Sequence, residues 1–190
     1  MKKIILASAS PRRKALLEQT GLKFIVCPSN YREIIDETLP PQKLVEKFAL
    51  EKAKDVFNKH KNSVIISADT VVSCGGKILG KPRDKAEAKE MLEFLSGKAH
   101  SIVTGFTIIF GENIITKSEE TKIFMKHLSP QDISDYITTR EPMDKAGAYA
   151  IQEKGNALIE KIEGDFDSAI GLPVKILLKE LENFGIKITQ

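Results

Sequence analysis

The sequence contains no long apolar run and few residues suited to disulfides or zinc. No stretch among its 190 residues approaches the roughly 20 apolar residues of a membrane-spanning helix. Its two cysteines, Cys27 and Cys74, form no CxxC motif, so we expect both to be reduced and structural. The apolar run Ile4 to Ala7 near the start is short for a secretory leader. We therefore expect a cytoplasmic protein with no membrane partner.

The signatures of several enzyme classes are also missing. The histidines His60, His100 and His127 lie far apart without an HExxH spacing, which argues against zinc. No G-x-S-x-G elbow supports a serine hydrolase. The formal net charge of +3 is too small to favour a broad nucleic-acid surface, so no stable nucleic-acid complex is expected. A negatively charged ligand would have to meet a local cluster of cations.

Composition and hydrophobic patterning predict one globular α/β domain over residues 1–190. Hydrophobic residues make up 42% and charged residues 29%, as is usual for soluble proteins. At least one long hairpin, around the turn GEN at residues 111–113, is antiparallel, so we expect a mixed sheet. A polar, glycine-containing loop is expected over 139–155. Strands are expected at 3–8, 24–29, 63–73, 77–80, 100–110, 113–128 and 156–164, and helices from Pro11, Gln42, Lys85, Pro130 and Pro173.

The stretch SASPRRKALL predicts a helix with Ser10 as its N-cap and Pro11 as its first residue. Its first turn carries Arg12, Arg13 and Lys14, although each exposed cation there is unfavourable by about 0.3–1 kcal/mol. A bound phosphate would relieve this mismatch, because helix-start amides and arginine side chains both bind anions. The alternative is that the side chains extend into water.

Asp69 lies within the apolar strand sequence VIISADTVV. A carboxylate in a buried strand requires a partner, since an unpaired charge there is strongly unfavourable. It could form a structural ion pair with a lysine or arginine, bind a divalent cation, or act as a general base. The residues alone leave these alternatives open.

The segment GGKILGKP comes close to a phosphate-binding P-loop. Gly75, Gly80 and Lys81 match the spacing, but Pro82 replaces the Ser or Thr that would hold magnesium. The segment also reads as a hairpin, whereas a P-loop joins a strand to a helix, so we reject this assignment. Lys81 either faces a phosphate on another scaffold or is a solvated turn lysine.

Two further polar features have alternative interpretations. The acidic loop residues Glu33, Asp36 and Glu37 could join Asp69 in a hard-metal site, or could form an ordinary solvated loop. Gln152 could read the edge of a nucleotide base through its amide, although most surface glutamines do not.

Several stretches, in this order, resemble the Maf family of nucleotide pyrophosphatases, which is historically tied to septum formation. The resemblance implies an α/β fold similar to that of inosine triphosphate pyrophosphatases, with an extended mixed sheet, flanking helices and two lobes around a central cleft. It spans nearly the whole chain. The matching stretches are LASASPRRKALL, ALEKAK, SADTVV, GKP, LSGKAHSIVTG, EPMDKAGAYAIQ and GDFDSAIGLP.

The family resemblance also implies an activity. It implies hydrolysis of a nucleoside triphosphate to the monophosphate and pyrophosphate, assisted by Mg or Mn, with Asp69 as proton acceptor. Arg12, Thr70 and Gln152 match specificity positions, and the sequence DKAGAYAIQ is similar to the branch acting on dTTP and UTP. The alternatives are the 7-methyl-GTP branch of the family and a non-catalytic nucleotide-binding regulator of septum formation.

The resemblance assigns further residues to the site. Lys52 and Lys81 match basic positions facing the phosphates, and Ser8 matches a polar position beside them. Arg13 is either a phosphate ligand or part of a structural ion pair, and a homodimer is left open as the oligomeric state. Asp69 and Glu33 are the metal candidates, although SNYREI matches the family's acidic stretch poorly. Two other departures are Ser67 and Ala150, which stand where Gly is common.

Overall fold

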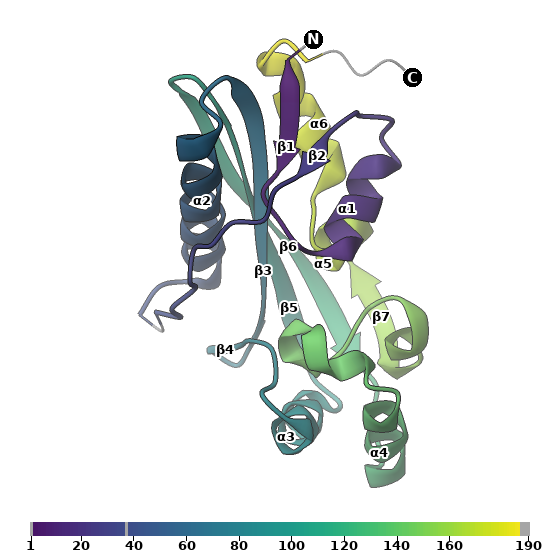
Figure 1. The fold of residues 1–190 in the computed structure, drawn as a ribbon. Helices are drawn as coiled ribbons and strands as arrows, with labels where there is room; N and C mark the ends of the chain where they lie inside the picture. The colour runs from purple at the N-terminus through teal and green to yellow at the C-terminus, as the bar shows by residue number, and fades with distance from the viewer. Residues whose placement is uncertain (1, 37, 187–190) are drawn as a thin grey trace. The chain divides into compact units, whose positions relative to one another are not determined.

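The computed structural model describes residues 2–36 and 38–186, and Glu37 lies outside the described residues. The strands form a seven-stranded mixed sheet in the order β2-β1-β3-β5-β6-β7, with β4 paired to β3 (Figure 1). The predicted α/β class with a mixed sheet is therefore confirmed. The strands are β1 Lys3–Leu6, β2 Ile25–Val26, β3 Ser63–Cys74, β4 Lys77–Leu79, β5 Ala99–Phe110, β6 Asn113–Met125 and β7 Ile159–Glu163.

Helices begin close to the residues expected from the capping patterns. Ser129 and Asp132 form the capping box of α4, and Asp84 caps α3 by accepting from the Glu87 amide. The helices are α1 Pro11–Glu18, α2 Pro41–Lys59, α3 Lys85–Leu95, α4 Pro130–Thr138, α5 Phe166–Ile170 and α6 Val174–Asn183.

The chain divides into two compact units that are discontinuous in sequence. The first unit contains the chain up to Asp69, Thr104–Glu119 and the chain from Gly171 onward, and the second contains Thr70–Val103 and Glu120–Ile170. The division falls inside β3, directly after Asp69.

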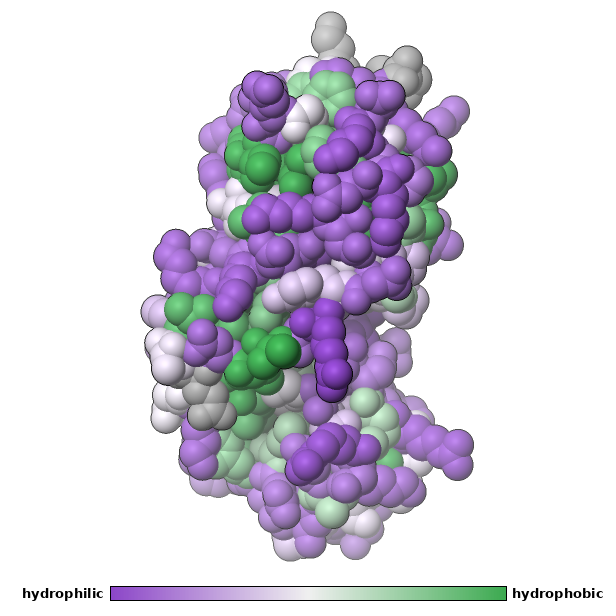
Figure 2. All heavy atoms as spheres, turned by 60° about the vertical axis from the view of Figure 1, so that its left-hand side comes forward, coloured by the Kyte–Doolittle hydropathy of each residue, from purple (hydrophilic) through white to green (hydrophobic). Residues whose placement is uncertain are grey.

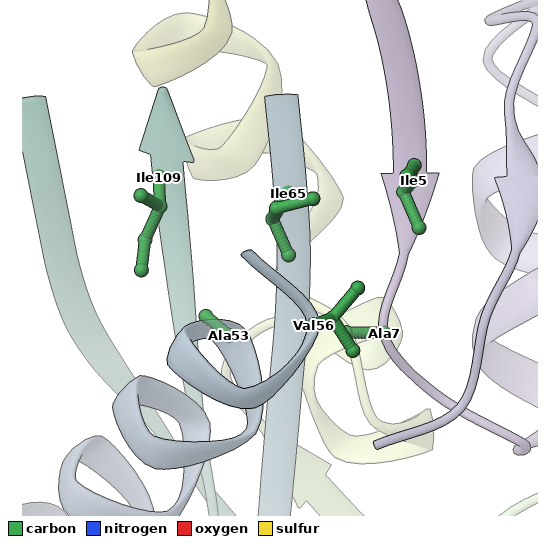
Figure 3. Packing of buried hydrophobic residues seen from close by; sticks show 6 residues of the cluster. All are labelled: Ile5, Ala7, Ala53, Val56, Ile65 and Ile109. Carbon is green, nitrogen blue, oxygen red and sulfur yellow. The ribbon is translucent and has the colours of Figure 1, made fainter. Parts of the chain in front are cut away.

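In the first unit, β1 pairs in parallel with both β2 and β3, with Ile5 opposite Ile25 and Ile65. Figure 1 shows α2 on one side of these strands and α1 with α6 on the other. Burial on both faces explains why β3 reads as a nearly continuous apolar run. The cluster in Figure 3 joins α2 to the strands through Ile5, Ala7, Ala53, Val56, Ile65 and Ile109.

Helix α2 approaches the sheet closely enough to require a small residue beneath it. A Cβ on Gly105 of β5 would lie 2.7 Å from the carbonyl carbon and oxygen of Val45. Ser67 of β3 donates a hydrogen bond of 2.5 Å to the Ala49 carbonyl of the same helix. Ser67, which stands where Gly is common in the family, thus adds a hydrogen bond between β3 and α2.

The second unit begins with the hairpin that the sequence predicts. Strands β3 and β4 are antiparallel, and Gly75 and Gly76 form the turn with φ of 56° and 80°. These left-handed angles suit a two-residue hairpin turn and favour glycine. Because this segment joins two strands instead of a strand and a helix, the rejection of a P-loop is confirmed. In the same unit, helix α3 packs against α4.

Some of the segment boundaries differ from the sequence expectation. The loop over 139–155 contains short 3-10 turns, and the last of them continues to Leu158, so β7 starts at Ile159 rather than at 156. Helix α5 was not expected, because five residues are too few to show helical periodicity. The 3-10 turns are Glu141–Asp144, Ala146–Ala148 and Glu153–Leu158.

Hydrophilic side chains cover most of the face drawn in Figure 2, with smaller apolar areas between them. Within residues 2–36 and 38–186, no helix combines the length and apolar character that crossing a membrane would require. The large apolar side chains that remain exposed are Ile25, Val26, Ile34, Ile35, Ile114 and Phe166.

A buried histidine links β5 to the loop of the second unit. His100 Nε2 lies 2.6 Å from Tyr149 Oη, and the two rings meet edge to face with centroids 5.5 Å apart. Burial lowers the pKa of His100 from 6.5 to about 4, while the backbone of Lys98 acts in the opposite direction. His100 is therefore neutral in the folded protein at neutral pH.

This burial makes stability depend on pH. From pH 6.5 down to about 4, the unfolded chain takes up a proton on His100 that the folded chain does not, so the free energy of unfolding falls as the pH falls. The shift corresponds to about 3 kcal/mol. In urea unfolding at several pH values, His100→Gln should lose this part of the pH dependence. Tyr149→Phe, which leaves His100 buried, should keep it, and an unchanged pH dependence in His100→Gln would contradict the prediction.

Candidate functional site

The N-terminus of α1 is built as its sequence predicts. Ser10 has extended backbone angles, and its side chain accepts a hydrogen bond of 3.4 Å from the Arg13 amide. The Ser10 amide in turn donates to Ser8 Oγ at 3.2 Å, and Ser8 is buried at the end of the strand segment. The first turn of α1 contains no acidic residue that would balance its arginines.

The Arg13 side chain links three segments of the first unit. Its Nε donates to the carbonyl of Gly171 at 2.8 Å, and Nη1 donates to Ser8 Oγ at 3.4 Å. Burial lowers the pKa of the Arg13 guanidinium, and the nearby carboxylates of Asp69 and Glu33 oppose that change. Arg13 thus has a structural role and also faces the acidic residues of the candidate site.

Asp69 is buried and paired, as its position in an apolar strand requires. Lys52 Nζ of α2 lies 2.6 Å from Asp69 Oδ1 and also contacts Glu33 Oε1. The side chains of Lys52 and Asp69 are 12% and 7% exposed, whereas Glu33 is 46% exposed. The ammonium therefore bridges one buried and one accessible carboxylate.

The charges around Asp69 act on its pKa in opposite directions. Burial raises the pKa of Asp69 above its ordinary value, Lys52 lowers it, Glu33 raises it and Arg13 lowers it. We call Arg13, Lys52, Glu33 and Asp69 the charge cluster, and Arg12, which is half-buried, acts electrostatically on Arg13, its neighbour in the chain. The charge cluster itself contains two cations and two carboxylates, and Arg12 next to Arg13 adds a positive charge with which an anion can pair.

The loop that carries Glu33 is fastened to α2. Asp55 Oδ2 accepts hydrogen bonds from Ser29 Oγ at 2.9 Å and from the Asn30 amide at 2.8 Å. The rings of Tyr31 and Phe48 add a contact with centroids 6.3 Å apart. Asp55 therefore helps to fix the chain ahead of Glu33, a role that no sequence motif indicates.

Glu33 and Asp69 provide oxygen ligands suited to a hard cation. Both carboxylates contact the same Lys52 ammonium, so both lie within reach of one positive charge. Magnesium is usually held by one or two carboxylates together with substrate phosphates. No group of three or more His, Cys, Asp or Glu side chains suited to a metal occurs within residues 2–36 and 38–186. A metal held jointly with phosphates fits this donor set.

The remaining residues assigned from the resemblance belong to the second unit. Thr70 follows Asp69 in β3 and is half-buried, and Lys81 is exposed just after β4. Gln152 is half-buried, with an extended backbone at φ −103° and ψ 174°. Of the predicted site residues, the structure thus brings together Ser8 with Arg13, and Arg13, Lys52 and Glu33 with Asp69.

The fold and the charge cluster define a mixed α/β protein with a buried, ion-paired carboxylate in its central strand. A family model described as Maf-like protein matches residues 3–184, and the chain therefore belongs to the Maf-like protein family. This result confirms the resemblance drawn from the sequence motifs.

Relatives agree with this assignment, and a solved structure of low sequence identity has a similar fold. A Bacillus anthracis protein named dTTP/UTP pyrophosphatase is 44% identical over 189 residues, covering 100% of this chain and 99% of the relative. A Bacillus cereus protein with the same name is 44% identical over 189 residues, covering 100% and 93%. The fold is similar to that of the Staphylococcus aureus Ham1 protein, with a TM-score of 0.54, 13% identity and coverage of 96% and 100%.

The Lys52 contact with Asp69 predicts a measurable loss of stability when the lysine is removed. In Lys52→Met the buried carboxylate loses the ammonium that contacts it at 2.6 Å, and the free energy of unfolding should fall by about 3 kcal/mol. Asp69→Asn added to this variant should recover part of the loss, because the buried group is then neutral. Urea unfolding measures both effects.

The matched control lies on the same helix. Lys54 forms an exposed ion pair with Glu51 at 2.8 Å, so Lys54→Met should change the free energy of unfolding by only about 0.5 kcal/mol. Equal effects of the two lysine substitutions would show that the contact with Asp69 contributes nothing beyond a surface ion pair.

Proposed function

We propose that this chain is a nucleoside triphosphate pyrophosphatase that hydrolyses dTTP and UTP to the monophosphate and pyrophosphate. The observation that carries the proposal is the buried Asp69 carboxylate held by Lys52 and facing Arg13. The names of the Bacillus relatives support the choice of pyrimidine nucleotides. Cys27 and Cys74 are both free thiols, in line with a cytoplasmic location.

In the proposed reaction, Asp69 takes a proton from the water that attacks the α-phosphorus. The new bond joins the water oxygen to that phosphorus, and the bond to the pyrophosphate oxygen breaks. Burial raises the pKa of Asp69, which makes its carboxylate a better proton acceptor while Lys52 favours its ionised form. Lys52 thus keeps the base charged and oriented before the reaction.

The cations would bind the triphosphate and the leaving group. A triphosphate carries about four negative charges, which positioned cations and helix-start amides can stabilise. We assign this role to Arg12, Arg13, Lys52 and Lys81, with Ser8 beside them. Glu33 and Asp69 would hold a divalent cation, Mg or Mn, which when bound supplies further positive charge for the phosphates.

Nucleotide choice is assigned to Arg12, Thr70 and Gln152. The Gln152 side chain carries both a donor and an acceptor, so its amide can pair with a base edge that presents the complementary pattern. It is half-buried, which leaves part of it accessible to a ligand. We assign Gln152 the contact with the pyrimidine base.

A nucleotide panel tests the activity. The chain is incubated with Mg and, in turn, dTTP, UTP, 7-methyl-GTP or dATP, and phosphate is measured after addition of inorganic pyrophosphatase. We expect most product from dTTP and UTP. A strong preference for 7-methyl-GTP would assign the chain to that branch of the family, and no product from any nucleotide would favour a nucleotide-binding regulator.

Asp69→Asn tests the assigned proton acceptor. The amide cannot accept the proton from water, so turnover should fall by at least about 10²-fold. Binding of dTTP, followed by calorimetry, should stay close to that of the unchanged chain because the cations remain. Glu51→Gln, on the exposed face of α2, is the control and should keep its turnover. Near-normal pyrophosphate release from Asp69→Asn would overturn the assignment.

A further inference from the structure

The segment that carries Gln152 is held at both ends by one pair of side chains. Glu141 Oε1 accepts hydrogen bonds from Tyr136 Oη at 2.9 Å and from the Gly155 amide at 3.1 Å, and Oε2 accepts from the Lys154 amide at 3.3 Å. Tyr136 Oη accepts in turn from the Ala150 amide at 3.1 Å. We call Tyr136 and Glu141 the loop clasp.

The loop clasp closes residues 150–155 into a tight loop. A Cβ on Gly155 would lie 2.2 Å from the Ala150 carbonyl oxygen and 2.7 Å from Tyr136 Oη, so only glycine fits there. Ala150 and Gly155 are buried at the base of the loop, whereas Gln152 between them is half-buried. The position of Gln152 therefore follows from how the base is held.

Backbone strain in this region indicates that the loop does not hold its shape unaided. Arg140, Ala148 and Glu153 have φ of 63°, 61° and 56°, and they are the non-glycine residues with positive φ in the described part of the chain. Such conformations are unfavourable for side-chain-bearing residues and persist only where surrounding contacts enforce them. Glu153 lies within residues 150–155, Ala148 precedes them by two residues, and Arg140 directly precedes Glu141 of the loop clasp.

The chemistry of the clasp gives its hydrogen bonds a fixed direction. Burial raises the pKa of Tyr136 well above its usual value, so its hydroxyl stays protonated and donates to Glu141. The same oxygen then accepts from the Ala150 amide, while Glu141 accepts from both amides after Gln152. A glutamine at position 141 would replace one acceptor oxygen with an amide donor and break this pattern.

We propose that Glu141, acting through Tyr136 and the backbone of residues 150–155, is the positioning residue that sets base discrimination by Gln152. The proposal rests on the proposed function, which gives Gln152 the base contact. Neither clasp residue touches the nucleotide in this account. Their effect is to hold the Gln152 amide where one base edge fits and another does not.

A double-mutant cycle with UTP and CTP tests the proposal, because these bases differ in the exocyclic group on C4. Glu141→Gln should lower the ratio of kcat/KM for UTP to that for CTP by about tenfold or more. The change should fall mainly on KM for UTP, since the Asp69 chemistry is untouched. Gln152→Ala should lower the ratio as well, and adding Glu141→Gln to it should produce no further change.

Asp132→Asn is the matched control, because Asp132 lies on α4 with Tyr136 but hydrogen bonds to Ser129 instead of the loop. It should keep the UTP preference even if the protein becomes less stable. If Glu141→Gln does not fold, Tyr136→Phe provides the same test by removing only the hydroxyl. Amide hydrogen exchange should show reduced protection at Ala150 and Gly155 in either variant.

The outcomes separate this proposal from the proposed function. An unchanged chain that hydrolyses no nucleotide overturns the proposed function, and the base discrimination with it. An unchanged chain that prefers UTP, together with clasp variants that keep the full preference, overturns only the role of Glu141. A further drop in the ratio when Glu141→Gln is added to Gln152→Ala also overturns it, because the clasp would then act independently of Gln152.

Discussion

The Asp69 carboxylate lies within β3 between apolar neighbours, and a charge in that position is tolerated only with cations beside it. Lys52 from α2 provides the direct contact, and Arg13 from α1 adds a second positive charge. Two helices from different parts of the chain must therefore reach one residue of the central strand. The packing of the first unit meets this requirement.

Lys52 reaches Asp69 because α2 lies close to the sheet. The close approach depends on Gly105, which leaves room for the backbone at Val45, and on the Ser67 hydroxyl bond to Ala49. Arg13 is oriented in a comparable way by its hydrogen bond to the Gly171 carbonyl, just before α6. The apolar core and the charge cluster are thus parts of one arrangement, in which packing places charges that could not be buried singly.

Local sequence rules predicted the features that depend on neighbouring residues. The Ser10 cap, the Gly75 and Gly76 turn and the buried strand around Asp69 all follow from short-range patterns. The partner of Asp69 did not follow from the residues alone, since the choice among ion pair, metal ligand and base depends on which helix packs against β3. The family resemblance named Lys52, but only as a residue facing phosphates.

Contacts between distant residues explain what the sequence did not reveal. Asp55 fastens the Glu33 loop, and Glu141 fastens the Gln152 loop, each through backbone amides that carry no sequence signature. The Glu-Pro pair at 141 and 142 begins EPMDKAGAYAIQ, one of the stretches that match the family, but the match assigns Glu141 no role. The role of Glu141 becomes visible once Tyr136 of α4 is placed beside it. The two side chains then accept hydrogen bonds from three backbone amides, those of Ala150, Lys154 and Gly155.

The two held residues differ in the kind of force that holds them. Asp69 is held by charge, and an arriving polyphosphate can compete for Lys52 and Arg13, so its surroundings are suited to change when an anion binds. Gln152 is held through backbone amides on a tyrosine and a glutamate, which already use their hydrogen-bonding groups within the protein. An anion has no favourable contact to make with the Glu141 carboxylate. We therefore expect the charge changes that accompany binding to leave the hydrogen bonds of the Gln152 segment unchanged. Recognition of the base and chemistry at the phosphate can then depend on separate interactions.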